Sequence, residues 1–335
     1  MSYKIGITGV GGGVGQGIMK SLYNTGYEIV AMDGENLGTG LYAAPCSYVI
    51  PYASSPNYIS SLLEICEKEK ISLLFPGMDA ELSLLSQSIN AFKAVGTTII
   101  VSSIDVIELS DDKQKMYDRL RQIGISVPFT TPLKHLKIES VQFPLIIKQM
   151  VGGARSKNVF LVKTIDEFDN LYTRIKDELD NFIAQEYIDG DEYTCGTVNL
   201  NNTCKGIIIM RRILRDGDTY KCFTEVNPVI EDEIKKVVAA INPFGACNIQ
   251  LRVKNGVPYI FEINARCSGT TASRTLCGFN EPKMIADYVL KGIEPEFEIK
   301  EQTILRYWNE IEVENITVNE LKANHTINQK NIKHL

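Results

Sequence analysis

The first 110 residues alternate short apolar runs with amphipathic stretches, and this rhythm constrains the fold more than any other feature. The apolar runs lie at 3–9, 28–33, 72–77 and 97–102, and the amphipathic stretches at 14–25, 57–69 and 79–89. Strands that alternate with helices in this way form parallel sheets, because each helix carries the chain back to the start of the next strand. We therefore expect an N-terminal parallel α/β unit.

The rhythm changes in the second half of the chain, where strand-like runs follow one another across short turns. These runs lie at 143–150, 158–162, 182–188, 192–200, 204–214, 247–253 and 258–265, with helical patterns near 165–179 and 229–242. Strands joined by short turns pair antiparallel. The sequence thus predicts α/β plus α+β architecture, in which antiparallel sheets follow the parallel one.

A chain of 335 residues exceeds the size that a single core usually serves, so several packed units are expected. The segment from Ser110 to Gly124 has the pattern of a capped helix closed by a C-terminal glycine, and Pro128 and Pro132 follow it. We place a hinge there. The expected units are 1–110, 111–182, 183–300 and a polar tail, 301–335, whose structure the sequence leaves open.

The composition excludes several functional classes. The chain has 35 basic and 41 acidic residues, a formal charge of -6, and no long basic run, so nucleic acid is not an expected partner. No apolar stretch approaches the length of a membrane span, and the N-terminus lacks a signal-peptide core, so we expect a cytoplasmic protein. Eight scattered cysteines and three histidines predict neither a disulfide framework nor a zinc site.

A glycine-rich turn, TGVGGGVGQG, follows the first strand-like run and precedes a helical pattern. Glycines at this position let a phosphate approach backbone amides, and Asp33 ends the next strand, as in dinucleotide sites. The spacing Gly9, Gly12, Gly15 is typical of short-chain dehydrogenases, and Tyr172 and Lys176 have the spacing of their catalytic pair. An NAD(P)-dependent oxidoreductase is therefore one alternative. We favour a turn that packs strand against helix or holds an organic substrate through Gly11 and Gly12, because no suitably placed serine completes the oxidoreductase set.

The first of three polar clusters is a strand that carries Lys148, followed by a glycine-containing loop and a second strand. A β-turn-β loop of this kind can fold over triphosphate oxygens while cations offset their charge. The loop residues expected to contact phosphates are Gly152, Gly153, Arg155 and Ser156.

The second cluster lies at the end of the strand-like run 182–188. Backbone groups and apolar neighbours there suit an adenine edge, and a carboxylate suits the two ribose hydroxyls. The residues expected at this nucleotide site are Gln185, Glu186, Tyr187, Ile188 and Glu192.

The third cluster lies on two strands joined by the turn KNGV. Alternation places Glu262, Asn264 and Arg266 on one face, and Gln250 can join them from the partner strand. Such side chains are costly to bury unless they bind something, and their hard oxygens suit Mg²⁺ that bridges phosphates. This face is therefore suited to a hard cation. On the run 204–214, Arg211 and Arg215 share a face opposite Arg212, and we expect Arg211 or Arg215 to bind a substrate carboxylate.

The order of these clusters gives the chain a resemblance to the ATP-grasp superfamily, in particular to one synthetase unit of the carbamoyl-phosphate synthase large subunit. The matching stretches are TGVGGGVGQG, the DDK that begins the hinge helix, IIKQMVGGARS, QEYIDGDEY, NIQLRV and FEINARCSG. The resemblance implies a pre-ATP-grasp domain followed by a two-part ATP-grasp domain. It implies that Lys113 and Lys148 contact ATP phosphates and that Gln250, Glu262 and Asn264 are the metal ligands. It also implies that Arg266 stabilises the transferring phosphoryl group, so that Lys148 and Arg266 are the expected catalytic residues.

The function implied is a Mg-ATP-dependent ligase, with Mn²⁺ as a possible substitute, that activates a small carboxylate as an acyl phosphate and couples it to an amine. Amino acids or related acids are the expected substrates, and a homodimer is a possible assembly. The chain departs from the large subunit because it contains one such unit, and Gln149 stands where many relatives have proline. An ATP-binding protein without ligase turnover is the other alternative.

Overall fold

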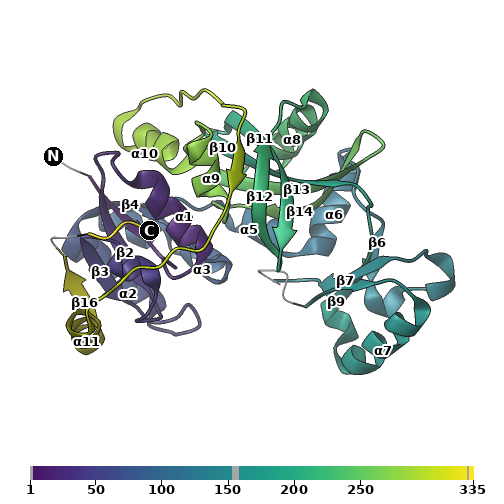
Figure 1. Cartoon of the computed structure of the whole chain (residues 1–335), viewed down its shortest axis with the longest axis horizontal. Helices are drawn as coiled ribbons and strands as arrows, with labels where there is room; N and C mark the ends of the chain where they lie inside the picture. Colours follow the sequence, from purple (N-terminus) through teal and green to yellow (C-terminus); the bar gives the residue numbers. More distant parts are fainter. Residues whose placement is uncertain (1–2, 153–157, 330–331) are drawn as a thin grey trace.

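The computed structural model describes residues 3–152, 158–329 and 332–335. Three sheets follow one another along the long axis of the molecule (Figure 1). The six-stranded N-terminal sheet lies at one end and a four-stranded sheet lies at the other, with a second six-stranded sheet, the long sheet, between them. The four-stranded sheet is called the middle sheet because its strands come second along the sequence. Within the described residues, none of the helices is both long and apolar enough to cross a membrane.

The N-terminal sheet has the order β16-β3-β2-β1-β4-β5, and β1 to β5 pair in parallel. Its core includes Ile5, Ile7, Leu73 and Phe75, all nearly inaccessible to solvent. These strands are β1 (Lys4–Ile7), β2 (Glu28–Asp33), β3 (Cys46–Val49), β4 (Ile71–Phe75) and β5 (Thr98–Ile99). The helices are α1 (Gly13–Leu22), α2 (Tyr58–Glu69), α3 (Leu82–Gln87), α4 (Ile89–Ala94) and α5 (Ile104–Asp111). The predicted parallel unit is confirmed.

The hinge segment contains two helices rather than one. Helix α5 runs through Ser110, and α6 (Lys113–Gln122) begins after Asp112, whose side chain accepts from the amide of Lys115. The predicted cap at Ser110 is therefore wrong, because that hydroxyl donates to a carbonyl within α5. Gly124, with φ +77°, follows the helix as the predicted C-terminal glycine.

The middle sheet has the order β6-β9-β7-β8 and is antiparallel. Its strands are β6 (Thr130–Pro132), β7 (Leu145–Gln149), β8 (Val159–Val162) and β9 (Phe182–Glu186), and α7 (Ile165–Ile175) connects β8 to β9. Thr164 caps α7, and Phe168 and Leu171 are its buried residues. The expected boundary between residues 182 and 183 falls inside β9, whose pairing assigns it to this sheet.

The long sheet has the order β14-β13-β10-β11-β12-β15 and is antiparallel. Its strands are β10 (Asp191–Leu200), β11 (Thr203–Arg215), β12 (Asp218–Thr224), β13 (Gly245–Lys254), β14 (Val257–Asn264) and β15 (Thr303–Leu305). Alternation turns Tyr193, Cys195, Ile249 and Leu251 toward α8 (Pro228–Ile241), which lies in the same core. The residues between them in the sequence point to the face of the sheet away from α8. Near the middle of the sheet most of these residues are polar.

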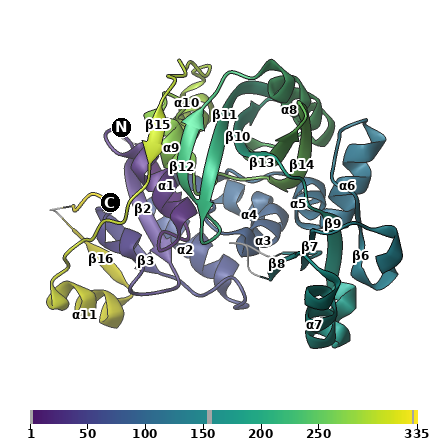
Figure 2. The ribbon, with the colours of Figure 1, turned by 45° about the vertical axis from the view of Figure 1, so that its right-hand side comes forward.

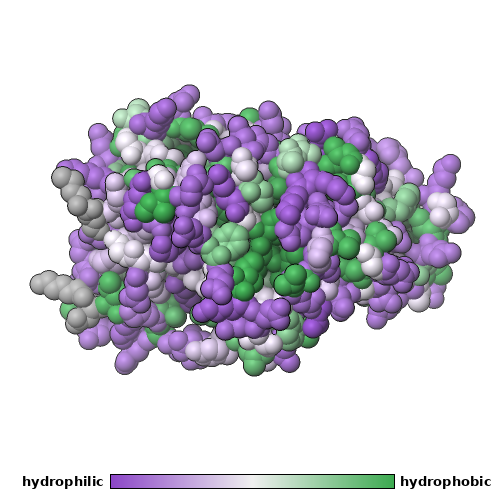
Figure 3. Space-filling view, turned by 90° about the horizontal axis from the view of Figure 1, so that it is seen from above, coloured by the Kyte–Doolittle hydropathy of each residue, from purple (hydrophilic) through white to green (hydrophobic). Residues whose placement is uncertain are grey.

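The C-terminal tail returns to the N-terminal sheet (Figure 1). Strand β15 pairs with β12, beside which Figure 2 shows it, and then α11 (Asn315–Asn324) and β16 (Thr326–Asn328) follow, with β16 pairing with β3. The last segment therefore ties the long sheet to the N-terminal sheet. Seen from above, hydrophilic residues cover most of the surface, and a hydrophobic hollow lies midway along the long axis (Figure 3).

Candidate active site

Lys148 lies at the junction of the middle and long sheets. Its side chain extends from β7, is almost fully buried, and has its ammonium nitrogen 3.3 Å from the carbonyl oxygen of Phe261 on β14. Burial lowers the pKa of Lys148 to about 8, although the nearby carboxylate of Glu262 opposes this shift. Among the described residues, no acidic side chain contacts this ammonium group directly, and it lies beside the strand that carries the predicted metal ligands.

Tyr117 connects the elements around this lysine. Its phenol oxygen accepts from Lys148 at 3.0 Å and from the amide nitrogen of Gln185 at 2.6 Å, and it donates to the carbonyl of Phe261 at 2.6 Å. Gln185 also donates to Thr130. Three sheet strands and α6 therefore meet at one hydroxyl. Tyr117 was not predicted from the sequence, because its role depends on contacts between segments that are far apart along the chain.

Lys113 lies at the first position of α6 and binds the start of the predicted phosphate loop. Its ammonium donates to the carbonyl of Gly152 at 2.6 Å, and the amide of Gly152 donates to Asp111 at 3.0 Å. Burial, and then the charge of Lys148, lower the pKa of Lys113. Two cations therefore approach one another near Glu262. Gly153, Arg155 and Ser156 lie outside the described residues.

The predicted metal ligands lie on neighbouring strands in register. Gln250 pairs with Glu262, and Asn248 pairs with Asn264. The amide nitrogen of Asn264 donates to the Glu262 carboxylate at 3.1 Å, while the Gln250 oxygen accepts from Arg212 at 2.6 Å. Carboxylate and amide oxygens keep further lone pairs, so the set fits a hard cation. Among the described residues no cluster of three or more His, Cys, Asp or Glu side chains could hold a metal.

Glu192 is enclosed by two arginines on the same face of the long sheet. One carboxylate oxygen accepts from Arg212 at 2.6 Å, and the other accepts from Arg252 at 2.6 Å. The guanidinium of Arg252 also donates to the carbonyl of Ile188 at 3.2 Å and lies 4.9 Å from the ring centre of Tyr187. Arg252 was missed at the level of sequence, although it stands two residues after Gln250 and alternation places both on one face.

Arg266 follows β14 and reaches the N-terminal unit. Its Nε and Nη2 atoms donate to the two carboxylate oxygens of Asp79, each at 2.8 Å. A third contact joins Nη2 to the side-chain oxygen of Asn264 at 3.3 Å. The polar face of the long sheet, the first turn of α6 and the N-terminal unit thus converge near Glu262.

Two family models match the chain: "PylC-like, N-terminal domain" over residues 7–100 and "ATP-grasp domain" over residues 110–270. The carbamoyl phosphate synthase large chain of Thermoanaerobacter pseudethanolicus is 27% identical over 277 residues. Residues 110–270 of the chain are an ATP-grasp domain. That match covers 76% of this chain but 24% of the relative, so the chain spans about a quarter of that relative's length.

Two solved structures share the fold of the chain. The N5-carboxyaminoimidazole synthetase of Staphylococcus aureus, complexed with ADP, aligns with a TM-score of 0.71 and 18% identity, covering 89% of this chain and 81% of that one. The L-amino acid ligase of Bacillus licheniformis aligns with a TM-score of 0.69 and 16% identity, covering 88% and 75%. The predicted fold class, a pre-ATP-grasp α/β domain followed by an ATP-grasp domain with antiparallel sheets, is confirmed.

The arginines of β11 differ from the positions expected for them. Arg211 faces away from the site and pairs with Glu225 at 2.7 Å, while Arg215 is exposed and stacks on Tyr220. Arg212 is the residue that reaches the site. The alternation was predicted correctly, but the sequence did not tell which face of β11 meets Gln250. The expected substrate contacts of Arg211 and Arg215 are therefore not supported.

The residues expected near adenine lie at the end of β9. The Glu186 carboxylate accepts from the amide of Phe129 at 3.3 Å, and Ile188 is buried. Gly190 permits the close approach of β13, because an added Cβ would lie 2.0 Å from the carbonyl oxygen of Val253. The strand end is thus pressed against the long sheet beside Glu192.

The glycine-rich turn packs tightly against the N-terminal sheet. An added Cβ at Gly15 would lie 2.4 Å from the carbonyl oxygen of Gly9. The carboxylate of Asp33 accepts hydrogen bonds from the backbone amides of Gly11 at 2.6 Å and Glu35 at 2.8 Å. It therefore stabilises the turn, whereas in a dinucleotide site the corresponding carboxylate would bind the ribose hydroxyls. Gly12 is the N-cap of α1.

The oxidoreductase alternative fails on this geometry. Tyr172 lies on α7 and Lys176 directly follows that helix. Helix α7 belongs to the unit of the four-stranded sheet, at the end of the molecule opposite the N-terminal unit that contains α1 (Figure 1). The tyrosine and lysine cannot act on a cofactor held at the glycine-rich turn.

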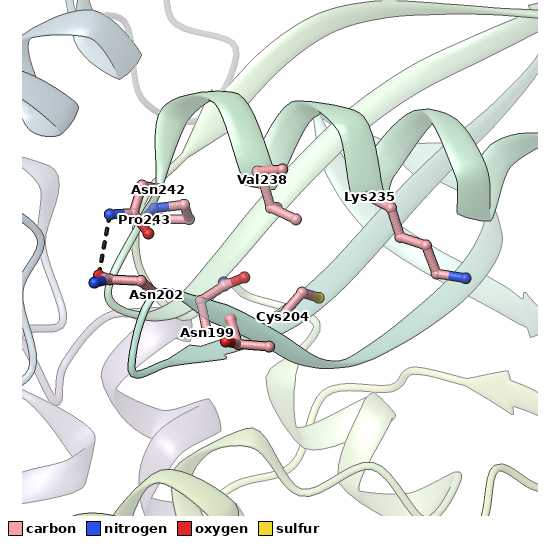
Figure 4. A pocket seen from close by; sticks show the side chains of 9 residues that line it. Asn199, Asn202, Cys204, Lys235, Val238, Asn242 and Pro243 are labelled. Atoms are coloured by element: carbon pink, nitrogen blue, oxygen red, sulfur yellow. Dashed lines mark hydrogen bonds between the residues drawn. The ribbon is translucent and has the colours of Figure 1, made fainter.

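A surface cavity of about 260 Å³ lies on the other side of the long sheet, between α8 and the β10–β11 turn. Figure 4 shows Lys235 and Val238 of α8 facing Asn199 and Cys204 across it. It holds none of the residues predicted from the sequence, and the core under α8 separates it from Glu262. It is not part of the candidate active site.

Proposed function

We propose that this chain is a Mg-ATP-dependent ligase that activates a small carboxylate as an acyl phosphate and joins it to an amine. The observation that carries the proposal is the convergence of Lys113, Lys148 and Glu262 where the two ATP-grasp sheets meet. The cations suit triphosphate oxygens, and the acid with its amide neighbours suits a hard cation.

The nucleotide would lie between the middle and long sheets. Lys113, Lys148 and the loop of Gly152, Gly153, Arg155 and Ser156 would contact its phosphates. Gln185, Glu186, Tyr187 and Ile188 would border the adenine. Glu192 would accept from the ribose by giving up one of the four hydrogen bonds that its carboxylate accepts from Arg212 and Arg252.

Glu262, Asn264 and Gln250 would hold Mg²⁺, which supplies charge neutralisation between phosphate oxygens. A substrate carboxylate oxygen attacks the γ-phosphorus, and the bond to the β-phosphate oxygen breaks, releasing ADP. Lys148 and Arg266 stabilise the negative charge on the transferring group. An amine then attacks the acyl carbon, phosphate leaves, and the nitrogen loses a proton. The protein's own task is to position the reactants and exclude water.

The similarity to an L-amino acid ligase supports amino acids or related acids as substrates, and the N-terminal unit with Gly11 and Gly12 is the proposed place for the carboxylate. Carbamoyl phosphate synthesis is not proposed, because the match covers only 24% of the carbamoyl phosphate synthase large chain.

Thermal unfolding with candidate nucleotides tests the proposal. Mg-ATP at 100 times its Kd would raise the free energy of unfolding by about 2.7 kcal/mol, whereas NAD(H) and NADP(H) would leave it unchanged. Glu262→Gln would reduce the Mg-ATP effect, and Glu301→Gln, at an exposed acid of the tail, would not. Stabilisation by NADP(H) with none by Mg-ATP would refute the ligase. Stabilisation by Mg-ATP without turnover would favour a binding protein.

A further inference from the structure

The guanidinium of Arg266 is clamped by an acid from a different unit of the chain. Asp79 lies 187 residues earlier, in the turn after β4, and makes two parallel hydrogen bonds to Nε and Nη2. The side chain of Arg266 is 11% exposed and that of Asp79 is 37% exposed. Bidentate pairing of this kind fixes the plane of the guanidinium as well as its position.

The turn that carries Asp79 is itself held by a buried carboxylate. Glu81 is fully buried, and one of its oxygens accepts from the amides of Gly77 and Met78, both at 2.9 Å. The same oxygen accepts from the hydroxyl of Thr8 at 2.7 Å. The other oxygen accepts from Tyr58. Asp79 is therefore a rigidly placed group rather than a surface acid that meets an arginine by chance.

The clamp leaves Arg266 few other orientations. Its Nη1 atom donates to the carbonyl of Cys267 at 2.9 Å, and Nη2 also contacts the oxygen of Asn264, a proposed metal ligand. Every guanidinium nitrogen of Arg266 thus has a hydrogen-bond partner. These contacts hold the cation beside the end of β14, which carries two of the proposed metal ligands. Without Asp79 only the contacts within its own segment would orient it.

We infer that Asp79 is a positioning residue through which the N-terminal unit holds Arg266 in place for phosphoryl transfer. The inference rests on the proposed function and deepens it. The unit expected to bind the carboxylate also sets the cation beside the metal ligands, so the reaction centre is complete only when both units are docked.

Substrate-dependent ADP release by Asp79→Asn, Asp79→Glu and the control Glu64→Gln tests this inference. Glu64 is an exposed acid of α2 in the same unit. Asp79→Asn would lower kcat by about 10- to 100-fold, the range found for supporting residues of a reactive centre. It would leave the Kd for Mg-ADP within about twofold, because Lys113 and Lys148 are untouched. Asp79→Glu would recover part of kcat, and Glu64→Gln would match the wild type.

A double-mutant cycle separates positioning from a general loss of structure. If Asp79 acts through Arg266, Asp79→Asn would change kcat by less than about twofold in an Arg266→Ala background. Equal losses in both backgrounds, or an active Asp79→Asn protein, would overturn the inference while leaving the ligase intact. A wild type that releases no ADP with any substrate would overturn the proposed function and the inference with it.

Discussion

The ammonium nitrogen of Lys148 lies 3.0 Å from the phenol oxygen of Tyr117, and this contact joins the middle sheet to the helix that begins the ATP-grasp domain. Gln185 donates to the same oxygen. The lysine is therefore held in place before any phosphate arrives, and its environment stabilises the neutral form more than water does.

This environment predicts a pH dependence of nucleotide binding. Lys148, with a pKa of about 8, is charged below that pH and loses its proton above it. The Kd for Mg-ATP would rise roughly tenfold between pH 7 and pH 9.5, the cost of losing a charge-assisted hydrogen bond. Calorimetric titration across this range measures it. Lys148→Arg stays charged and would show a flatter profile; parallel profiles in the two folded proteins would contradict the assignment.

The glycine-rich turn predicts a difference between two substitutions in one helix. Gly15→Ala places a Cβ 2.4 Å from a backbone oxygen and would lower the free energy of unfolding by roughly 1–3 kcal/mol. Gly13→Ala meets no atom within 4 Å and would be neutral or stabilising by about 0.4–1 kcal/mol. Chemical denaturation compares them. Equal losses for both would show that packing is not the reason for glycine at position 15.

We predict that the C-terminal tail contributes to the free energy of unfolding. Leu321 of α11 is fully buried in the core shared by the N-terminal and long sheets. Leu321→Ala would lower the free energy of unfolding by about 2–5 kcal/mol. Ile316 of the same helix is 63% exposed, and Ile316→Ala would change it by less than about 0.5 kcal/mol. A Leu321→Ala protein as stable as the wild type would show that the tail is not anchored.

The fold class could be predicted from the order of strand-like and helical segments. Strands that alternate with helices form the parallel sheet, and strands that are joined by short turns form the antiparallel sheets. The spacing of Glu262, Asn264 and Arg266 predicted one strand face, and the structure places Glu262 and Asn264 on β14 with Arg266 just after its end. Their role as a metal site stays a prediction. The face of β11 was not readable, because an arginine on either side of a strand looks the same until the neighbouring strand is known. For this reason Arg211 and Arg215 were predicted to lie in the site, whereas the structure places Arg212 there, beside Glu192 and Gln250.

Contacts between segments that are far apart along the chain could not be predicted from the sequence. Asp79 follows a strand like many loop acids, and only the docking of the N-terminal unit brings it to Arg266. The tail gave no periodic signal because its two strands have three residues each, Thr303–Leu305 and Thr326–Asn328. Such short strands depend on the sheet edges that they join rather than on their own propensity.

Substrate-stimulated ADP release tests the central claim most directly. The purified protein is supplied with Mg-ATP and pools of amino acids and other small carboxylates, beside Glu262→Gln and the control Glu301→Gln. We predict ADP release that depends on a carboxylate pool, that Glu262→Gln reduces by about 100-fold or more, and that Glu301→Gln leaves unchanged. Release that Glu262→Gln leaves at the wild-type rate would contradict the assignment of the active site.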